Sequence, residues 1–353
     1  MNSVALPRIR TEHTRALVLP GLSVLLVGMA LLALGSGAIG IPASQVLAAL
    51  WRKAAGEPAQ AGDAIVWALR LPRVLMACLV GAALASSGAA MQGLFRNPLV
   101  EPGLIGVSSG AALGAIGMMV LGGPIMASLP AVASSFGVAM AAFVGGLAAT
   151  CLVYLLGRRR PGMATLLLAG VAISAVAIAG VGMLTFVANE HQLRDLSFWT
   201  LGSLGGTDGW RLAAVAGPML LPIVLMLRDA RALNALLLGE QDAALLGFQP
   251  GRVRARLIVL VAMATSAAVA MCGVIGFVGL LVPHVLRMIW GPDHRLLLPG
   301  SALAGATLLV AADTVARVVV APAELPIGVL TALLGGPFFL WLLMRTRIGE
   351  AQA

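Results

Sequence analysis

The chain has 353 residues, of which 60% are hydrophobic and only 10% are charged, and its mean hydropathy is +1.00. Soluble globular proteins have about 25% charged residues, because a water-facing surface needs them. The composition therefore excludes a soluble enzyme and indicates a protein that spans a lipid bilayer. The net charge of +9 comes from short arginine clusters between apolar runs, which is typical of membrane-protein loops and does not indicate nucleic-acid binding.

Apolar runs long enough to cross a bilayer follow one another along the whole chain. We predict ten membrane spans near 16–37, 66–92, 104–122, 133–156, 163–188, 211–228, 253–276, 278–290, 297–320 and 326–345. The first run is long for a signal peptide and is expected to remain as a span, whereas the eighth is short and is expected to cross only in part. The predicted fold is an all-α membrane bundle in a single domain, 1–353.

The basic residues of the loops orient this bundle. Most of them fall on the side of the N-terminus, which is the cytoplasmic side under the positive-inside rule. We therefore expect a cytoplasmic N-terminal segment, 1–15, and a cytoplasmic tail, 346–353. Gly, Ala and Ser are frequent within the spans, which predicts helices packed closely together.

The connection between the second and third spans has an unusual sequence. Pro98, Pro102 and Gly103 prevent a continuous helix, and Asn97 can bond the freed backbone groups. Irregular backbone at membrane depth is tolerated only where protein or a water-filled cavity covers it. The segment is either a gate that lines a pathway or a plain cytoplasmic turn.

The longest cytoplasmic segment, 229–251, fits two short amphipathic helices broken at Gly239. Each helix is too short to be stable alone, so a partner surface is expected to brace them. An elbow that lies on the lipid head groups is the alternative.

A few ionisable residues lie close to the predicted spans. Asp313 and Arg317 have the i, i+4 spacing of a helix ion pair, whose role is either structural or functional. Arg70 and Arg73 break the charge pattern at the outer side, where arginines could bind carboxylates of an external partner. His284 has no second ligand at metal-binding spacing, and His294, among cytoplasmic charges, needs no special role. We expect no metal site and no permanently bound cofactor.

The energy source is indicated by a missing motif. A phosphate-binding Walker loop needs a lysine followed by Ser or Thr, and the only lysine, Lys53, is followed by Ala54. Any ATP that drives transport must be hydrolysed by another subunit. No nucleophile–base pair or carboxylate pair is present either, so we predict no catalytic residues. An ion-coupled transporter would need carboxylates near the bilayer midplane, and these are nearly absent.

Several ordered motifs together resemble the permeases of iron–siderophore, haem and cobalamin ABC importers, the FecCD-type family. The motifs are Leu69-Arg70-Leu71-Pro72-Arg73, Gly81-Ala82-Ala83-Leu84-Ala85, Gly88-Ala89-Ala90-Met91-Gln92, Arg96-Asn97-Pro98-Leu99, Gly106-Val107-Ser108-Ser109-Gly110-Ala111, Leu168-Ala169-Gly170-Val171, Trp199-Thr200-Leu201-Gly202-Ser203-Leu204, Gly276-Phe277-Val278-Gly279-Leu280 with Pro283-His284, Asp313 with Arg317, Glu324-Leu325-Pro326-Ile327-Gly328 and Gly335-Gly336-Pro337-Phe338-Phe339. The resemblance covers almost the whole chain beyond the first span.

The resemblance implies a homodimer of ten-helix subunits in the bacterial inner membrane, with two cytoplasmic ATPases that bind ATP and Mg and a periplasmic binding protein. It implies three sets of site residues. They are Arg70, Arg73 and Arg317 for docking of the binding protein; Gly239, Glu240, Ala243, Leu246 and Gly247 for coupling to the ATPase; and Asn97, Leu99, Met163 and Ala164 for the cytoplasmic gate. At the last two gate positions some relatives have hydroxyl residues.

The cargo is indicated only by the wording of one stretch. Met91 to Leu99 followed by Glu101-Pro102-Gly103-Leu104-Ile105-Gly106 looks most like haem permeases. Haem is therefore the expected cargo, with cobalamin or a ferric siderophore as alternatives.

Overall fold

The computed structural model describes residues 9–60, 62–159 and 162–346, and all regular secondary structure in these ranges is helical. Seven helices are long and apolar enough to cross a membrane: α1 (Ile9–Gly35), α3 (Leu71–Leu94), which extends the π-helical turn η1 (Ile65–Arg70), α7 (Gly137–Arg159), α8 (Met163–Val187), α10 (Gly209–Arg228), α13 (Pro250–Cys272) and α15 (His294–Val318). Two further apolar helices, α4 (Val107–Leu121) and α14 (Val278–Trp290), are shorter. A third, α16 (Ile327–Thr346), has a shorter apolar stretch, Ile327–Trp341.

These ten helices correspond one for one to the ten predicted spans. The short eighth span is confirmed as α14, whose 13 residues reach only about 20 Å at 1.5 Å per residue. The remaining elements of the described ranges are α2 (Ala43–Ala55), the 3₁₀ turn η2 (Pro102–Ile105), α5 (Gly123–Ser128), α6 (Ala131–Ser135), α9 (Glu190–Leu201), α11 (Ala230–Leu238) and α12 (Glu240–Leu245).

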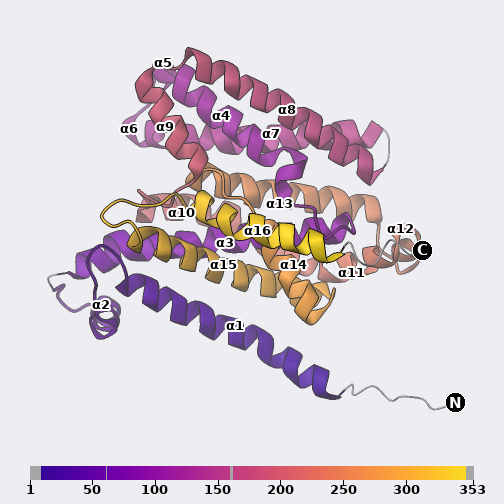
Figure 1. Ribbon diagram of the computed structural model, residues 1–353, viewed down its shortest axis with the longest axis horizontal. Helices are drawn as coiled ribbons and strands as arrows, with labels where there is room; N and C mark the ends of the chain where they lie inside the picture. The colour runs from indigo at the N-terminus through magenta and orange to yellow at the C-terminus, as the bar shows by residue number, and fades with distance from the viewer. Residues whose placement is uncertain (1–8, 61, 160–161, 347–353) are drawn as a thin grey trace.

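The long helices run side by side along the long axis of the molecule (Figure 1). Helices α4, α7 and α8 pack together as one group, and α13 joins this group to α3 and α10. Helix α15 packs along α3, and α1 covers α15. The bundle has one end that carries α2 and an opposite end that carries α11 and α12. We refer to these as the α2 end and the α12 end.

Glycines allow the central helices to approach backbone to backbone. A Cβ atom at Gly88 of α3 would lie 1.7 Å from the carbonyl oxygen of Gly279 of α14. Gly81 of α3 and Gly305 of α15 meet in the same way, each 2.2–2.4 Å from the other's carbonyl oxygen when a Cβ is built. The predicted close packing by small residues is therefore confirmed at the core.

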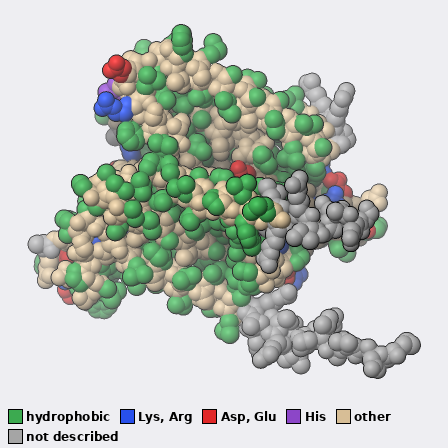
Figure 2. Space-filling view, viewed as in Figure 1, with side chains coloured by type: hydrophobic (Ala, Val, Ile, Leu, Met, Phe, Trp, Pro, Cys, Tyr) green, Lys and Arg blue, Asp and Glu red, His purple; other side chains and the backbone are tan. Residues whose placement is uncertain are grey.

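Charged side chains gather toward the two ends of the visible face, with few of them between (Figure 2). The middle of this face is covered largely by hydrophobic side chains. Helix α8 shows why: its apolar side chains point outward, and Phe186 is 90% exposed. Such a surface is stable in lipid and not in water.

Four features differ from the prediction. Helix α1 begins at Ile9, so the expected cytoplasmic segment 1–15 is partly helical, whereas the tail beyond Thr346 lies outside the described residues. Helix α13 ends at Cys272 and not at 276, because Gly273 adopts a positive φ of 70°. Helices α2 and α9 were not predicted, since neither contains an apolar run of spanning length.

Candidate functional site

Three arginines meet at the α2 end, where η1, the first turn of α3 and the last turn of α15 come together. Arg73 Nη2 lies 2.8 Å from Asp313 Oδ1, and Arg317 Nε lies 2.9 Å from Asp313 Oδ2. Arg73 also donates two hydrogen bonds, of 2.8 and 2.9 Å, to the carboxylate of Glu324. The predicted pair of Asp313 and Arg317 is confirmed. Arg73 is a third member of this cluster that no feature of the sequence indicated.

Arg70 and Arg317 bind the end of α1. Arg70 donates to the carbonyl oxygen of Leu34 at 2.7 Å and to that of Ile39. Arg317 donates to the carbonyl oxygens of Ser36 and Ala33 at 3.0 and 3.2 Å. The last carbonyls of a helix have no partner within the helix, and here the two guanidinium groups satisfy them.

The burial of these arginines limits which of them a partner could reach, and their role in docking stays a prediction. Arg70 and Arg317 are each only 7% exposed, because both are committed to the backbone after α1. All three still line one cavity of about 370 Å³, together with Glu324. Glu324 is 43% exposed, and its hydrogen bonds from Arg73 hold the pKa of its carboxyl below its ordinary value. An acidic group that entered this cavity would compete with Glu324 for Arg73.

At the α12 end, α11 and α12 are the two predicted short helices, and we name this pair of helices the elbow. The break falls at Gly239, whose φ of 130° and ψ of 160° favour glycine. Two ion pairs fasten the elbow to α13, one between Asp229 and Arg256 and the other between Glu240 and Arg254.

The elbow exposes apolar side chains to its surroundings. Leu238, Leu245 and Leu246 are 66%, 87% and 60% exposed, and we name these three residues the elbow patch. Of the predicted coupling residues, Glu240, Leu246 and Gly247 lie at the surface and Gly239 is half-buried. Ala243 is completely buried and therefore packs toward the bundle.

The connection from α3 to α4 is irregular, as predicted. Arg96 has a positive φ of 51°, and the side chain of Asn97 accepts a 3.0 Å hydrogen bond from the Leu99 backbone N–H. Asn97 and Leu99 are exposed. Met163 and Ala164 form the first turn of α8, half-buried and exposed respectively.

This connection packs against α8 and borders a cavity. A Cβ atom at Gly170 of α8, about two turns from Met163, would lie 2.0 Å from the carbonyl oxygen of Leu104. The cavity has a volume of about 400 Å³ and is lined by the α3–α4 connection, α8 and the segment 274–279. Its polar lining residues are Glu101, Ser108, Ser109, Ser174 and Thr265. The assignment of the four gate residues stays a prediction.

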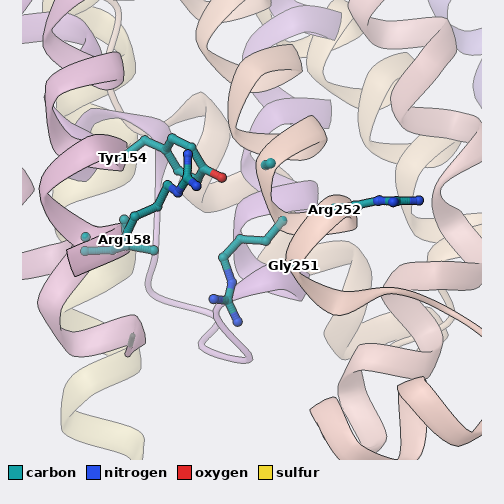
Figure 3. A pocket seen from close by; sticks show the side chains of 8 residues that line it. Tyr154, Arg158, Gly251 and Arg252 are labelled. Atoms are coloured by element: carbon teal, nitrogen blue, oxygen red, sulfur yellow. The ribbon is translucent and has the colours of Figure 1, made fainter. Parts of the chain in front are cut away.

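A third cavity, of about 380 Å³, lies between the end of α7 and the start of α13, and the sequence did not predict it. Figure 3 shows Arg158 alongside Tyr154, with the guanidinium 5.8 Å from the ring centroid, whereas Arg252 extends away from them. Arginines at the ends of apolar helices are typical of a membrane–water interface.

The sequence reasoning also missed a polar junction between α11 and α15. His294, which was given no role, is completely buried and contacts Asn234 of α11. The only hints in the sequence are an asparagine within an apolar stretch and an Asp-His pair at the start of a span. His284, for which the sequence shows no second ligand at metal-binding spacing, lies in the middle of α14.

Comparison with known proteins adds to this geometry. The model of the FecCD transport family matches residues 25–345. The chain belongs to this family. It is 48% identical over 331 residues to the hemin transport system permease protein HmuU of Yersinia pestis, covering 92% of this chain and 96% of HmuU. It is 43% identical over 285 residues to the vitamin B12 import system permease protein BtuC of Salmonella typhi, covering 81% of this chain and 85% of BtuC.

Comparison with solved structures also leads to ABC transporters. A metal-chelate type ABC transporter in an inward-facing conformation superposes with a TM-score of 0.80 at 34% identity, covering 93% of this chain and 99% of that one. PsaBC from Streptococcus pneumoniae, at 19% identity and a TM-score of 0.56, shares the fold. This FecCD-family chain is therefore a multi-pass inner-membrane permease subunit of an ABC importer, a class in which a separate subunit hydrolyses ATP.

Proposed function

We propose that this permease passes haem from a periplasmic binding protein to the cytoplasm, as a homodimer driven by two separate ATPase subunits. The observation that carries the choice of haem is the 48% identity to a hemin permease along nearly the whole of both chains. The vitamin B12 permease is similar over a shorter length, at 43%. Cobalamin and a ferric siderophore are the alternative cargoes.

The charge distribution supports the orientation. The α12 end carries the elbow and the arginines of the third cavity, and positively charged loops favour the cytoplasm. We therefore place the α12 end and both termini in the cytoplasm, and the arginine cluster with Glu324 in the periplasm.

The elbow patch supports contact with an ATPase. Three large leucine side chains at the tips of short helices are costly in water, and a partner protein would cover them. A lipid surface could cover these leucines as well. If the ATPase covers them, it should bind the permease without added lipid.

The ion network argues against an ion-coupled secondary transporter. Asp313 is the only acidic residue within the described apolar spans of the ten helices, because Glu12 lies in the first turn of α1, ahead of its apolar span Leu17–Gly35. Its carboxylate is paired with both Arg73 and Arg317, so it cannot bind and release a coupling ion without leaving the buried Arg317 uncompensated and Arg73 paired with Glu324 alone.

The test is uptake into proteoliposomes that contain the permease and its ATPase, with a loaded binding protein added outside. We expect ATP-dependent accumulation of haem that excess unlabelled haem abolishes. Accumulation of cobalamin or a ferric siderophore, with no uptake of haem, would overturn the choice of cargo.

A further inference from the structure

The polar junction between α11 and α15 consists of Asn234, Asp293 and His294. Asn234 Nδ2 donates a 2.7 Å hydrogen bond to Asp293 Oδ1. Asn234 Oδ1 accepts a 2.8 Å hydrogen bond from the His294 backbone N–H and lies 2.9 Å from His294 Nδ1. The amide therefore has one orientation, with its NH₂ toward the carboxylate and its oxygen toward the histidine.

The α15 side of this junction is rigid. Asp293 is the N-cap of α15, and its Oδ1 also accepts the Arg295 backbone N–H at 3.0 Å. His294 is completely buried, and a Cβ atom at Gly93 of α3 would lie 2.3 Å from His294 Nε2. Asn234 thus reaches from the elbow into a closely packed contact between α3 and α15.

The other polar attachments of the elbow are different in kind. The ion pairs of Asp229 with Arg256 and of Glu240 with Arg254 both lead to α13, and each has one partner about half exposed. Among the attachments seen in the described residues, the junction at Asn234 is the one that leads to α15 and has a completely buried residue.

Helix α15 connects this junction to the opposite end of the bundle. It is helical over 25 residues, from His294 to Val318, with Pro299 near its start, and its last turns carry Asp313 and Arg317 of the arginine cluster. A helix of this length spans about 37 Å at 1.5 Å per residue and moves largely as one body when it is packed along its length.

We propose that Asn234 is a positioning residue for transport: through Asp293 and His294 it ties α11 to the first turn of α15, so that a movement of the elbow reaches the arginine cluster. This inference rests on the proposed function, because it takes the elbow as the ATPase contact and the arginine cluster as the contact of the binding protein.

An exchange of the two polar side chains provides the test. Asn234→Asp places two carboxylates at one hydrogen-bond distance, and they repel. Asp293→Asn removes the charge but keeps a residue that caps helices well and can accept from Asn234. In the double variant, Asn234→Asp with Asp293→Asn, an amide again faces a carboxylate, and the His294 N–H keeps its acceptor. The four proteins form a double-mutant cycle.

The cycle is measured with the complete complex in proteoliposomes, as cargo moved per ATP hydrolysed and as the stimulation of hydrolysis by the loaded binding protein. For Asn234→Asp we expect both to fall about tenfold through this repulsion, with the ATPase still bound in normal stoichiometry. The double variant is expected to return to within about twofold of wild type, because the donor and acceptor are restored. A loss of stability alone would lower the yield of complex without changing cargo per ATP.

The inference would be overturned if Asn234→Asp moved as much cargo per ATP as wild type. It would also be overturned if the double variant folded but still moved less cargo per ATP. Should Asn234→Asp fail to assemble, Asn234→Ser removes both hydrogen bonds without adding charge, and normal coupling in it would be equally contrary. If the wild-type complex itself shows no ATP-driven uptake, the proposed function fails and this inference fails with it. Uptake by wild type with unchanged coupling in the variants refutes the inference alone.

Discussion

The guanidinium of Arg73 lies 2.8 Å from the carboxylate of Asp313, and this contact joins the start of α3 to the end of α15. Asp313 is completely buried and also pairs with Arg317 one turn further along its helix. The carboxylate balances two arginines, one of which also binds the end of α1. The α2 end is therefore held together by one ion network, in which Glu324 is the exposed member.

Removing the buried member of this network should cost far more stability than removing the exposed one. Asp313→Asn leaves two arginines without a buried countercharge, and breaking such a pair costs about 3–5 kcal/mol. Glu324→Gln breaks a largely exposed pair, which contributes about 1 kcal/mol or less. Thermal unfolding of the detergent-purified permease measures the difference, and equal midpoints for the two variants would contradict the described network.

Glu324 should also weaken docking of the binding protein, because it occupies the donors of Arg73 that an incoming carboxylate would use. We expect Glu324→Gln to raise the affinity for the binding protein severalfold, and Arg73→Gln to lower it. Surface-immobilised permease titrated with binding protein gives both values. Arg211→Gln, at a half-buried arginine on the same end that contacts the Gly206 backbone, is the matched control and should leave the affinity unchanged. A lower affinity in Glu324→Gln would show that Glu324 belongs to the docking surface.

Close helix packing predicts a sharp difference between two glycines. In Gly88→Ala the new methyl group would overlap the Gly279 carbonyl, whose backbone cannot move without shifting α14, so we expect a loss of about 3 kcal/mol or more. Gly28→Ala in α1 meets no atom within 4 Å and should be neutral or slightly stabilising through its helix propensity. Chemical denaturation in detergent compares them, and a fully stable Gly88→Ala would contradict the packing of α3 on α14.

Much of this fold follows from hydropathy, because each span must satisfy its own backbone in lipid and so becomes a helix. The break at Gly239 and the ion pair of Asp313 with Arg317 follow from local residue chemistry in the same way. Contacts between segments far apart in the sequence could not be predicted in this way. Arg73 lies 240 residues from Asp313, and Asn234 lies 59 residues from Asp293. No periodicity or spacing in one sequence records such contacts.

The arginines predicted to dock the binding protein, Arg70, Arg73 and Arg317, also make contacts that the sequence does not reveal. Their charge and outer position indicated a surface that binds carboxylates, but burial and partners depend on where the chain after α1 lies. Because Leu34 and Ile39 present carbonyl oxygens to Arg70, that side chain serves the fold of its own subunit. Only Arg73, paired with an exposed carboxylate, keeps a donor set that a partner could compete for.

The connection between α2 and α3 should resist acid. Arg52 donates two hydrogen bonds to Asp63, and these with the Gln60 backbone N–H lower the pKa of Asp63 to about 2. Since the pKa is depressed in the folded state, the stabilisation is complete above the ordinary value near 3.8 and is lost as the pH falls through about 2. In the wild-type protein, the protection factors of the α2 amides in hydrogen exchange should therefore be the same at pH 4 as at pH 7. In Asp63→Asn these amides should be less protected at both pH values. Equal protection in the variant would rule out this anchor.

The elbow patch should be needed for binding of the ATPase. Leu246→Glu places a charge where an apolar contact is expected, and we predict at least a tenfold loss of ATPase affinity, equivalent to about 1.4 kcal/mol. Gln241→Glu adds the same charge at an exposed position of α12 outside the patch and is expected to have little effect. Co-purification in detergent, without added lipid, reports binding; equal losses in the two variants would indicate a charge effect and not a contact.

The most direct test of the whole account is haem uptake by proteoliposomes with and without a hydrolysing ATPase partner. With the binding protein outside and ATP inside, uptake is predicted to occur with the wild-type ATPase. It should stop when that subunit carries an inactivating substitution. Haem accumulation at the same rate with the inactive ATPase, or with no ATPase at all, would contradict the account.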